Sequence, residues 1–204
     1  MKYRFRIFIL SIFGFINISG QTDLPLSHTI DSMAARDQQS RHLLVLIENG
    51  ETDSVSIDEA LHLIQITDSL NFPLLKSIFE IHGYPGYDKV GKNSSHNFWL
   101  LVQHADKYPE FQQQVLDSMQ VEVSAGNAYG ADYAYLVDRV KINTGQLQIY
   151  GTQMILNNDS TSYIPRPVID PDKLDERRHS VGLPPMDFYI NAMNENYFGT
   201  LKKE

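Results

Sequence analysis

The segment WLLVQHAD, residues 99–106, places three polar residues on an otherwise apolar helix. At about 100° per residue, a helix over 95–106 carries apolar side chains on nearly every side: Phe98, Trp99, Leu100, Leu101, Val102 and Ala105. Such a helix is expected at the centre of its domain. Buried polar groups need hydrogen-bond partners. Gln103, His104 and Asp106 are therefore expected either to join a polar network, with Asp106 capping the helix junction, or to belong to a site.

Apolar residues at helical spacing predict further helices on both sides of this one. We expect them over 28–49, 56–70, 73–83, 109–123 and 127–140. Ser56 and Asn127 are the predicted N-caps, and Glu59 completes a capping box with Ser56. The segment GYPGYDKVGKNSS, residues 83–95, holds three glycines and a proline and is predicted to be a loop.

The period of the pattern changes after residue 143. QLQIYGTQMIL (146–156) alternates between turn segments at 143–145 and 157–160, and TSYIP (161–165) supplies a partner strand. Short helices are expected over 170–180 and after Pro184. The fold class is therefore mainly α, a single helical domain with one small antiparallel β-hairpin near the C-terminal third.

The composition supports one globular domain and excludes several functions. The chain has 204 residues, of which 42% are hydrophobic, and a net charge of −8. An acidic chain without a basic stripe is a poor partner for nucleic acid. The absence of cysteine excludes disulfides, thiol catalysis, zinc–thiolate sites and lipoprotein anchoring.

The first twenty residues have the pattern of a secretory signal peptide. Lys2, Arg4 and Arg6 precede a short apolar run, and small polar residues end the segment. We expect cleavage before Gln21, leaving a mature domain over 21–204 that is exported to the periplasm or secreted. An uncleaved N-terminal anchor is the alternative. No further apolar segment predicts a membrane span after cleavage.

No metal site is expected. His96 and His104, with Asp106 or His82, carry suitable ligand atoms, but the two histidines are eight residues apart and no HExxH motif occurs. No other cofactor is expected. The motifs GxSxG and SxxK, which mark serine nucleophiles, are also absent.

Six motifs in order give the chain a family resemblance. They are DQQSR (37–41), HGYPG (82–86), WLLVQHAD (99–106), AYLVDRV (134–140), QIYGTQ (148–153) and RRHSVGL (177–183). Together they resemble the bacterial domain of unknown function 6624 family over about residues 30–190. Tyr84 departs from the tryptophan usual there. The resemblance implies a mostly α-helical fold and no established activity.

The motifs are more polar than packing alone requires, which suggests a shared polar cleft between the QHAD helix, the DR helix and a YGTQ strand. His104 is the candidate acid or base for general acid–base hydrolysis, because its ordinary pKa lies near working pH. Asp138 is expected to orient it, and Arg139 or Arg41 to hold an anionic group. The candidate substrate-binding residues are Asp37, Gln38, Arg41, Gln103, Tyr150 and Gln153.

Other interpretations remain open. Asp37 and Arg41, one helical turn apart, can simply pair with each other. Gly151 marks either a bulged hairpin packed on the helices or a close backbone approach. The whole chain can be an enzyme, a non-catalytic envelope module that binds a small molecule, peptide or glycan, or a structural domain with a buried polar network.

Overall fold

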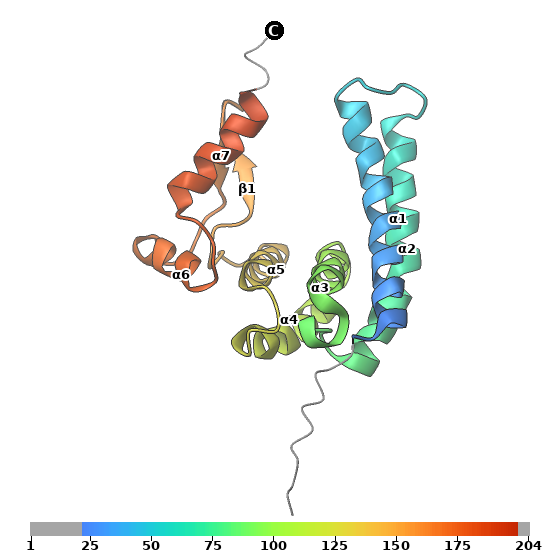
Figure 1. The fold of residues 1–204 in the computed structure, drawn as a ribbon. Coiled ribbons are helices and arrows are strands. Elements are labelled where there is room, and N and C mark those ends of the chain that lie inside the picture. Colours follow the sequence, from blue (N-terminus) through green and yellow to red (C-terminus); the bar gives the residue numbers. More distant parts are fainter. Residues whose placement is uncertain (1–21, 200–204) are drawn as a thin grey trace, which may run out of the picture.

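The computed structural model describes residues 22–199, and their fold is mainly α-helical, as predicted. Two long helices pack side by side, three more cross beside them, and a hairpin with two C-terminal helices lies on the far side (Figure 1). The elements are α1 (Leu24–Glu48), α2 (Ile57–His82), α3 (Tyr87–Gln103), α4 (Pro109–Ser124), α5 (Gly130–Asn143), β1 (Met154–Leu156), β2 (Tyr163–Pro165), a 3-10 turn (Pro171–Lys173), α6 (Leu174–Ser180) and α7 (Met186–Phe198).

The second helix begins as predicted but does not stop where expected. Ser56 and Glu59 form the capping box. The predicted break before Pro73 is wrong, because α2 continues to His82 with Pro73 inside it. A proline inside a helix costs about 3 kcal/mol, and the packing of α2 against α1 outweighs that cost. Asn71 lies at the junction, where its side-chain amide donates to the Met33 carbonyl of α1.

The predicted loop over 83–95 is also largely helical. The third helix begins at Tyr87 and is kinked at Gly91, where φ is 79°. Asn127, predicted to cap the helix that follows it, instead accepts hydrogen bonds at the start of α3. Its side-chain oxygen accepts from the Asp88 N–H, and its backbone oxygen accepts from Tyr87. Gly83 therefore ends α2, whereas Gly91 kinks α3 without ending it.

The hairpin exists but is shorter than predicted. The strands β1 and β2 pair antiparallel over three residues each. The YGTQ segment (150–153), predicted to be a strand, is a loop. Just before it, Gln148 forms an isolated bridge with Val168. Gly151 has φ 67°, and a Cβ placed there would meet the Met186 sulfur at 3.1 Å. Gly151 therefore marks a point where the backbone of this loop lies close to the Met186 side chain.

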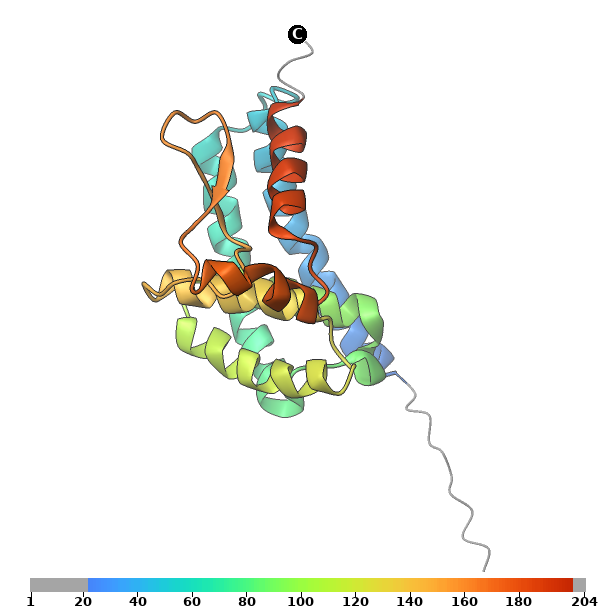
Figure 2. The ribbon, with the colours of Figure 1, turned by 90° about the vertical axis from the view of Figure 1, so that its left-hand side faces the viewer.

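The kinked helix α3 is the centre of the fold. It contacts α1, α2, α4 and α5. Phe98 and Val102 are fully buried, and Trp99 and Leu101 nearly so. Figure 2 shows α5 lying across the molecule, with the hairpin and α7 standing over it. The end of α3, where the QHAD residues lie, therefore meets both the α1–α2 pair and α5. Within residues 22–199, no helix is long and apolar enough to cross a membrane.

Candidate functional site

The histidine of WLLVQHAD forms a pair with a buried aspartate of α1. His104 follows the last residue of α3, and its Nδ1 lies 2.9 and 3.0 Å from the two carboxylate oxygens of Asp37. The Asp37 side chain is 1% exposed and that of His104 is 14% exposed. The pair therefore joins α1 to the end of α3, while the imidazole keeps an exposed edge.

The neighbours of the pair indicate which ring nitrogen holds the proton. Arg41 Nε lies 3.0 Å from His104 Nδ1 and 3.3 and 3.4 Å from the Asp37 oxygens. A guanidinium nitrogen is always protonated, and its N–H lies within reach of both His104 Nδ1 and the Asp37 oxygens. The same carboxylate repels a lone pair on Nδ1 and attracts a proton there. The neutral tautomer that satisfies both Asp37 contacts carries its proton on Nδ1, directs the Arg41 N–H to the carboxylate and leaves Nε2 as the basic nitrogen.

One arginine serves two carboxylates whose pKa values move apart. Arg41 Nη2 lies 3.2 Å from Asp37 and 2.7 Å from Asp68 of α2. Burial alone raises the pKa of Asp37, but the hydrogen bond and charge of His104, with the charge of Arg41, hold it below its ordinary value. Burial raises the pKa of Asp68, and Arg41 only partly offsets this. Asp37 therefore ionises more readily than Asp68.

These groups open onto a cavity of about 200 Å³. Its walls come from α1, α2, the end of α3, the turn between α3 and α4, and one residue of α5. Apolar side chains of α2 and α3 share the lining with the charged groups, and Phe72 stacks on Tyr108 with ring centroids 3.5 Å apart. The lining residues are Asp37, Arg41, Asp68, Ser69, Asn71, Phe72, Leu75, Leu101, His104, Ala105, Asp106, Lys107, Tyr108 and Arg139.

The arginine of the DR motif lines the same cavity as part of a second ion pair. Arg139 donates through Nε and Nη2 to the two carboxylate oxygens of Asp106, at 2.8 and 2.6 Å. Asn143 and Gln112 also donate to Asp106. Burial opposes ionisation of Asp106, but Arg139 prevails and keeps its pKa below the ordinary value. Both arginines proposed to hold an anion thus already face carboxylates.

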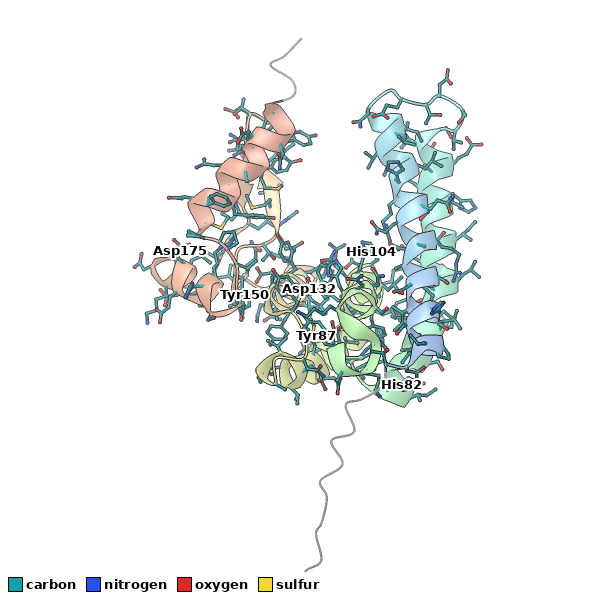
Figure 3. All side chains as sticks on the ribbon, viewed as in Figure 1. His82, Tyr87, His104, Asp132, Tyr150 and Asp175 are labelled. Carbon is teal, nitrogen blue, oxygen red and sulfur yellow. The ribbon has the colours of Figure 1, made fainter. Side chains whose placement is uncertain are left out.

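The other predicted site residues lie apart from the Asp37–His104 pair. Asp138 is 0% exposed and does not contact His104. Its carboxylate accepts the N–H groups of Ile149, Tyr150 and Thr152 and the Thr152 hydroxyl, at 2.7–3.2 Å. None of residues 148–153 lines the cavity. Figure 3 places His104 between α3 and α1, whereas Tyr150 lies between α5 and α6. The structure places Asp37, rather than Asp138, beside the histidine.

The RRHSVGL motif holds the same loop from its carbonyl side. Arg177 Nε donates to the Ile149 carbonyl at 2.8 Å, and Arg178 Nη1 donates to the Tyr150 carbonyl at 2.7 Å. Arg178 is 1% exposed and also donates to Pro184. Residues 149–152 are therefore held from two sides. Asp138 accepts hydrogen bonds from their N–H groups, and Arg177 and Arg178 donate to their carbonyls. These motifs share a structural network.

The three glutamines among the predicted site residues lie in different surroundings. Gln38 Nε2 donates to Asp37 at 2.8 Å, so it contributes to the pair from an exposed position. Gln103 is half-buried at the end of α3, and its carbonyl accepts from Gln112. Gln153 donates to the Thr152 hydroxyl within the loop. Only Gln38 of these three directly contacts the Asp37 carboxylate.

Asp68 was missed by the sequence reasoning, although a signal was present. It lies at helical spacing between Ile64 and Phe72, so an acidic residue interrupts an inward-facing part of α2. Its partner Arg41 is distant in the sequence, and no local pattern relates the two.

The histidines once considered as metal ligands lie in separate pairs. His96 Nδ1 contacts Asp132 of α5 at 2.7 Å, while His104 contacts Asp37. Within the described part of the chain, no group of three or more His, Asp or Glu side chains is arranged to hold a metal ion. His96 and His104 therefore belong to two different pairs rather than to one cluster.

Replacing Asp37 with asparagine should destabilise the protein in a pH-dependent manner. The pKa of Asp37 is lowered from 3.8 by folding, so its ionised form stabilises the native state above that pH. This contribution disappears as the pH falls through the lower pKa of the folded state. We expect urea unfolding at pH 7 to show a loss of about 1–3 kcal/mol for Asp37→Asn. The difference from wild type should shrink at pH 3, and a constant difference would contradict this account.

The fold and this site define a class: a mainly α-helical protein with a carboxylate–histidine pair at the wall of a small cavity. The chain belongs to the Family of unknown function (DUF6624), whose model matches residues 25–203. This agrees with the resemblance carried by the motifs. No curated protein and no solved structure matches the chain.

Proposed function

We propose that this is an exported protein that catalyses general acid–base hydrolysis at the cavity beside His104. The observation that carries the proposal is the contact between the buried Asp37 carboxylate and His104 Nδ1. A carboxylate on Nδ1 fixes the tautomer and supports the imidazolium that forms when Nε2 takes a proton. His104 also lines the cavity, so its imidazole is beside the space in which a substrate would lie.

The proposed step needs no protein nucleophile. His104 Nε2 accepts a proton from water as the water oxygen attacks the substrate, and the resulting imidazolium is held by Asp37. Arg41 keeps Asp37 ionised through its close contact with the carboxylate. The absence of serine-nucleophile motifs in the sequence is consistent with direct attack by water.

A non-catalytic binding function is the second candidate. The observation that favours it is that Arg41 and Arg139 are both paired with carboxylates, which makes the cavity a preformed hydrogen-bonding surface. The purified mature protein should therefore be screened against esters, peptides and glycosides, with His104→Ala and His96→Ala beside wild type. Hydrolysis that depends on His104 alone supports the enzyme. Ligand binding without turnover supports the binding module.

Export is the part of the proposal that rests on the N-terminal sequence, since residues 1–20 lie outside the described residues. We expect expression in a bacterial host to give a mature chain that begins at Gln21 in the periplasm or medium. Intact-mass measurement checks this. Replacing Lys2, Arg4 and Arg6 with acidic residues should cause the uncleaved precursor to accumulate. A mature protein that retains Met1 would contradict cleavage and favour the anchor.

A further inference from the structure

We propose that the cavity beside His104 takes a single neutral sugar ring, and that Asp68 protonates the glycosidic oxygen as the bond breaks. This inference rests on the proposed function, because it uses the Asp37–His104 pair as the base. It adds a substrate class and a proton donor that neither the motifs nor the family supply.

The size of the cavity sets the first limit on the substrate. Its volume is about 200 Å³. Pockets for drug-sized ligands run to roughly 300–1,000 Å³, so this one suits a single small ring with polar substituents. A longer glycan would place one residue in the cavity and extend the remainder outside.

The aromatic wall matches one face of such a ring. Phe72 and Tyr108 both line the cavity, stacked with an interplanar angle of 7°. Tyr108 is 40% exposed, although Phe72 covers one of its faces. A sugar ring has a C–H face that packs on an aromatic surface and a rim of hydroxyls that needs polar partners. Tyrosine offers both an apolar ring and a polar tip.

The charges of the wall favour a neutral ligand over an anion. An anionic group is held best by an unpaired guanidinium that binds it through two hydrogen bonds. Here Arg41 already donates to Asp37 and to Asp68 Oδ1, and Arg139 is paired with Asp106. Lys107 also lines the cavity, but from the exposed turn between α3 and α4. These contacts place N–H donors and carboxyl acceptors side by side, which suits hydroxyl groups.

Asp68 is the proposed proton donor, since Arg41 Nη2 donates to its Oδ1 and its Oδ2 can carry the proton. It lines the same cavity as His104 but comes from α2, and its side chain is 30% exposed. Burial raises its pKa, whereas Asp37 on the same arginine has a lowered pKa. Two carboxyl groups whose environments separate their pKa values in this way suit the roles of acid and supporting anion.

The reaction balances with water as the only co-reactant. The bond between the anomeric carbon and the glycosidic oxygen breaks, and the departing oxygen takes the proton of Asp68. The water oxygen bonds to the anomeric carbon, and its proton passes to His104 Nε2. The products are a free sugar and an alcohol. Transfer of the proton from His104 to Asp68 through solvent restores the starting state.

The test compares two leaving groups on the full mature protein. A methyl glucoside needs a proton on its departing oxygen, whereas a 4-nitrophenyl glucoside does not. We expect Asp68→Asn to slow hydrolysis of the methyl glucoside by about 10²–10⁴-fold, and that of the 4-nitrophenyl glucoside by less than about tenfold. Both anomers should be assayed. Asp117→Asn, at an exposed position of α4, is the matched control and should change neither rate.

A binding measurement tests the neutral ring independently of turnover. Titration calorimetry should show glucose binding to wild type more tightly than glucuronate, and Tyr108→Ala should weaken glucose binding by about tenfold or more. Equal loss on both glucosides in Asp68→Asn would overturn the proton-donor role. Tighter binding of glucuronate, or hydrolysis confined to esters or peptides, would overturn the sugar assignment. In that last case, dependence on His104 would still uphold the proposed function.

Discussion

Replacing Asp138 with alanine should lower the free energy of unfolding by roughly 3–5 kcal/mol, because several donors lose a charged acceptor at once. The side chain is fully buried and accepts three backbone N–H groups of residues 149–152 and the Thr152 hydroxyl. Water cannot readily replace it at this depth. Urea unfolding at pH 7 measures the effect, and the loop with the helices packed on it should lose order together.

The control for this variant is Asp117→Ala, which removes an exposed aspartate of α4 that accepts a hydrogen bond from Gln113. It should stay within about 0.5 kcal/mol of wild type. Asp138→Asn should lie between the two, since an amide keeps one acceptor but brings a donor against the N–H groups. A stable Asp138→Ala variant that has lost hydrolysis would instead place Asp138 in catalysis, as the sequence first indicated.

Replacing His104 with alanine should lower the rate of hydrolysis by about 10²–10⁴-fold, the usual contribution of a positioned general base. The variant should remain folded, because Asp37 keeps Arg41 and Gln38 as partners. The measurement is kcat/KM on the best substrate from the screen, with circular dichroism to check the fold.

The chain contains a matched control for this experiment. His96 also contacts a buried aspartate, Asp132, at 2.7 Å, but it does not line the cavity. His96→Ala removes the same type of side chain from the same type of pair and should leave kcat/KM unchanged. Equal losses in the two variants would mean that the rate reflects general stability, and would exclude His104 as the base.

Asp138 and Arg139, the two residues of the DR motif, illustrate why only part of the site could be predicted. Adjacent residues of a helix point about 100° apart. Asp138 and Arg139 were therefore expected to contact different parts of the protein. The sequence does not say which of them faces His104. In the fold, Arg139 reaches the cavity and Asp138 turns to the 149–152 loop. Asp37, treated from sequence as a helix-face partner of Arg41, occupies the position beside the histidine.

Local patterns determined the helices, the Ser56 capping box, the existence of a hairpin and the central place of WLLVQHAD, because periodicity, capping and turn chemistry act between residues close in the chain. Only the tertiary structure decided that α2 runs through Pro73, that YGTQ is a clamped loop, and that Asp68 shares Arg41 with Asp37. Those outcomes depend on contacts between distant segments, whose packing and buried charges outweigh local preference and leave no local signature.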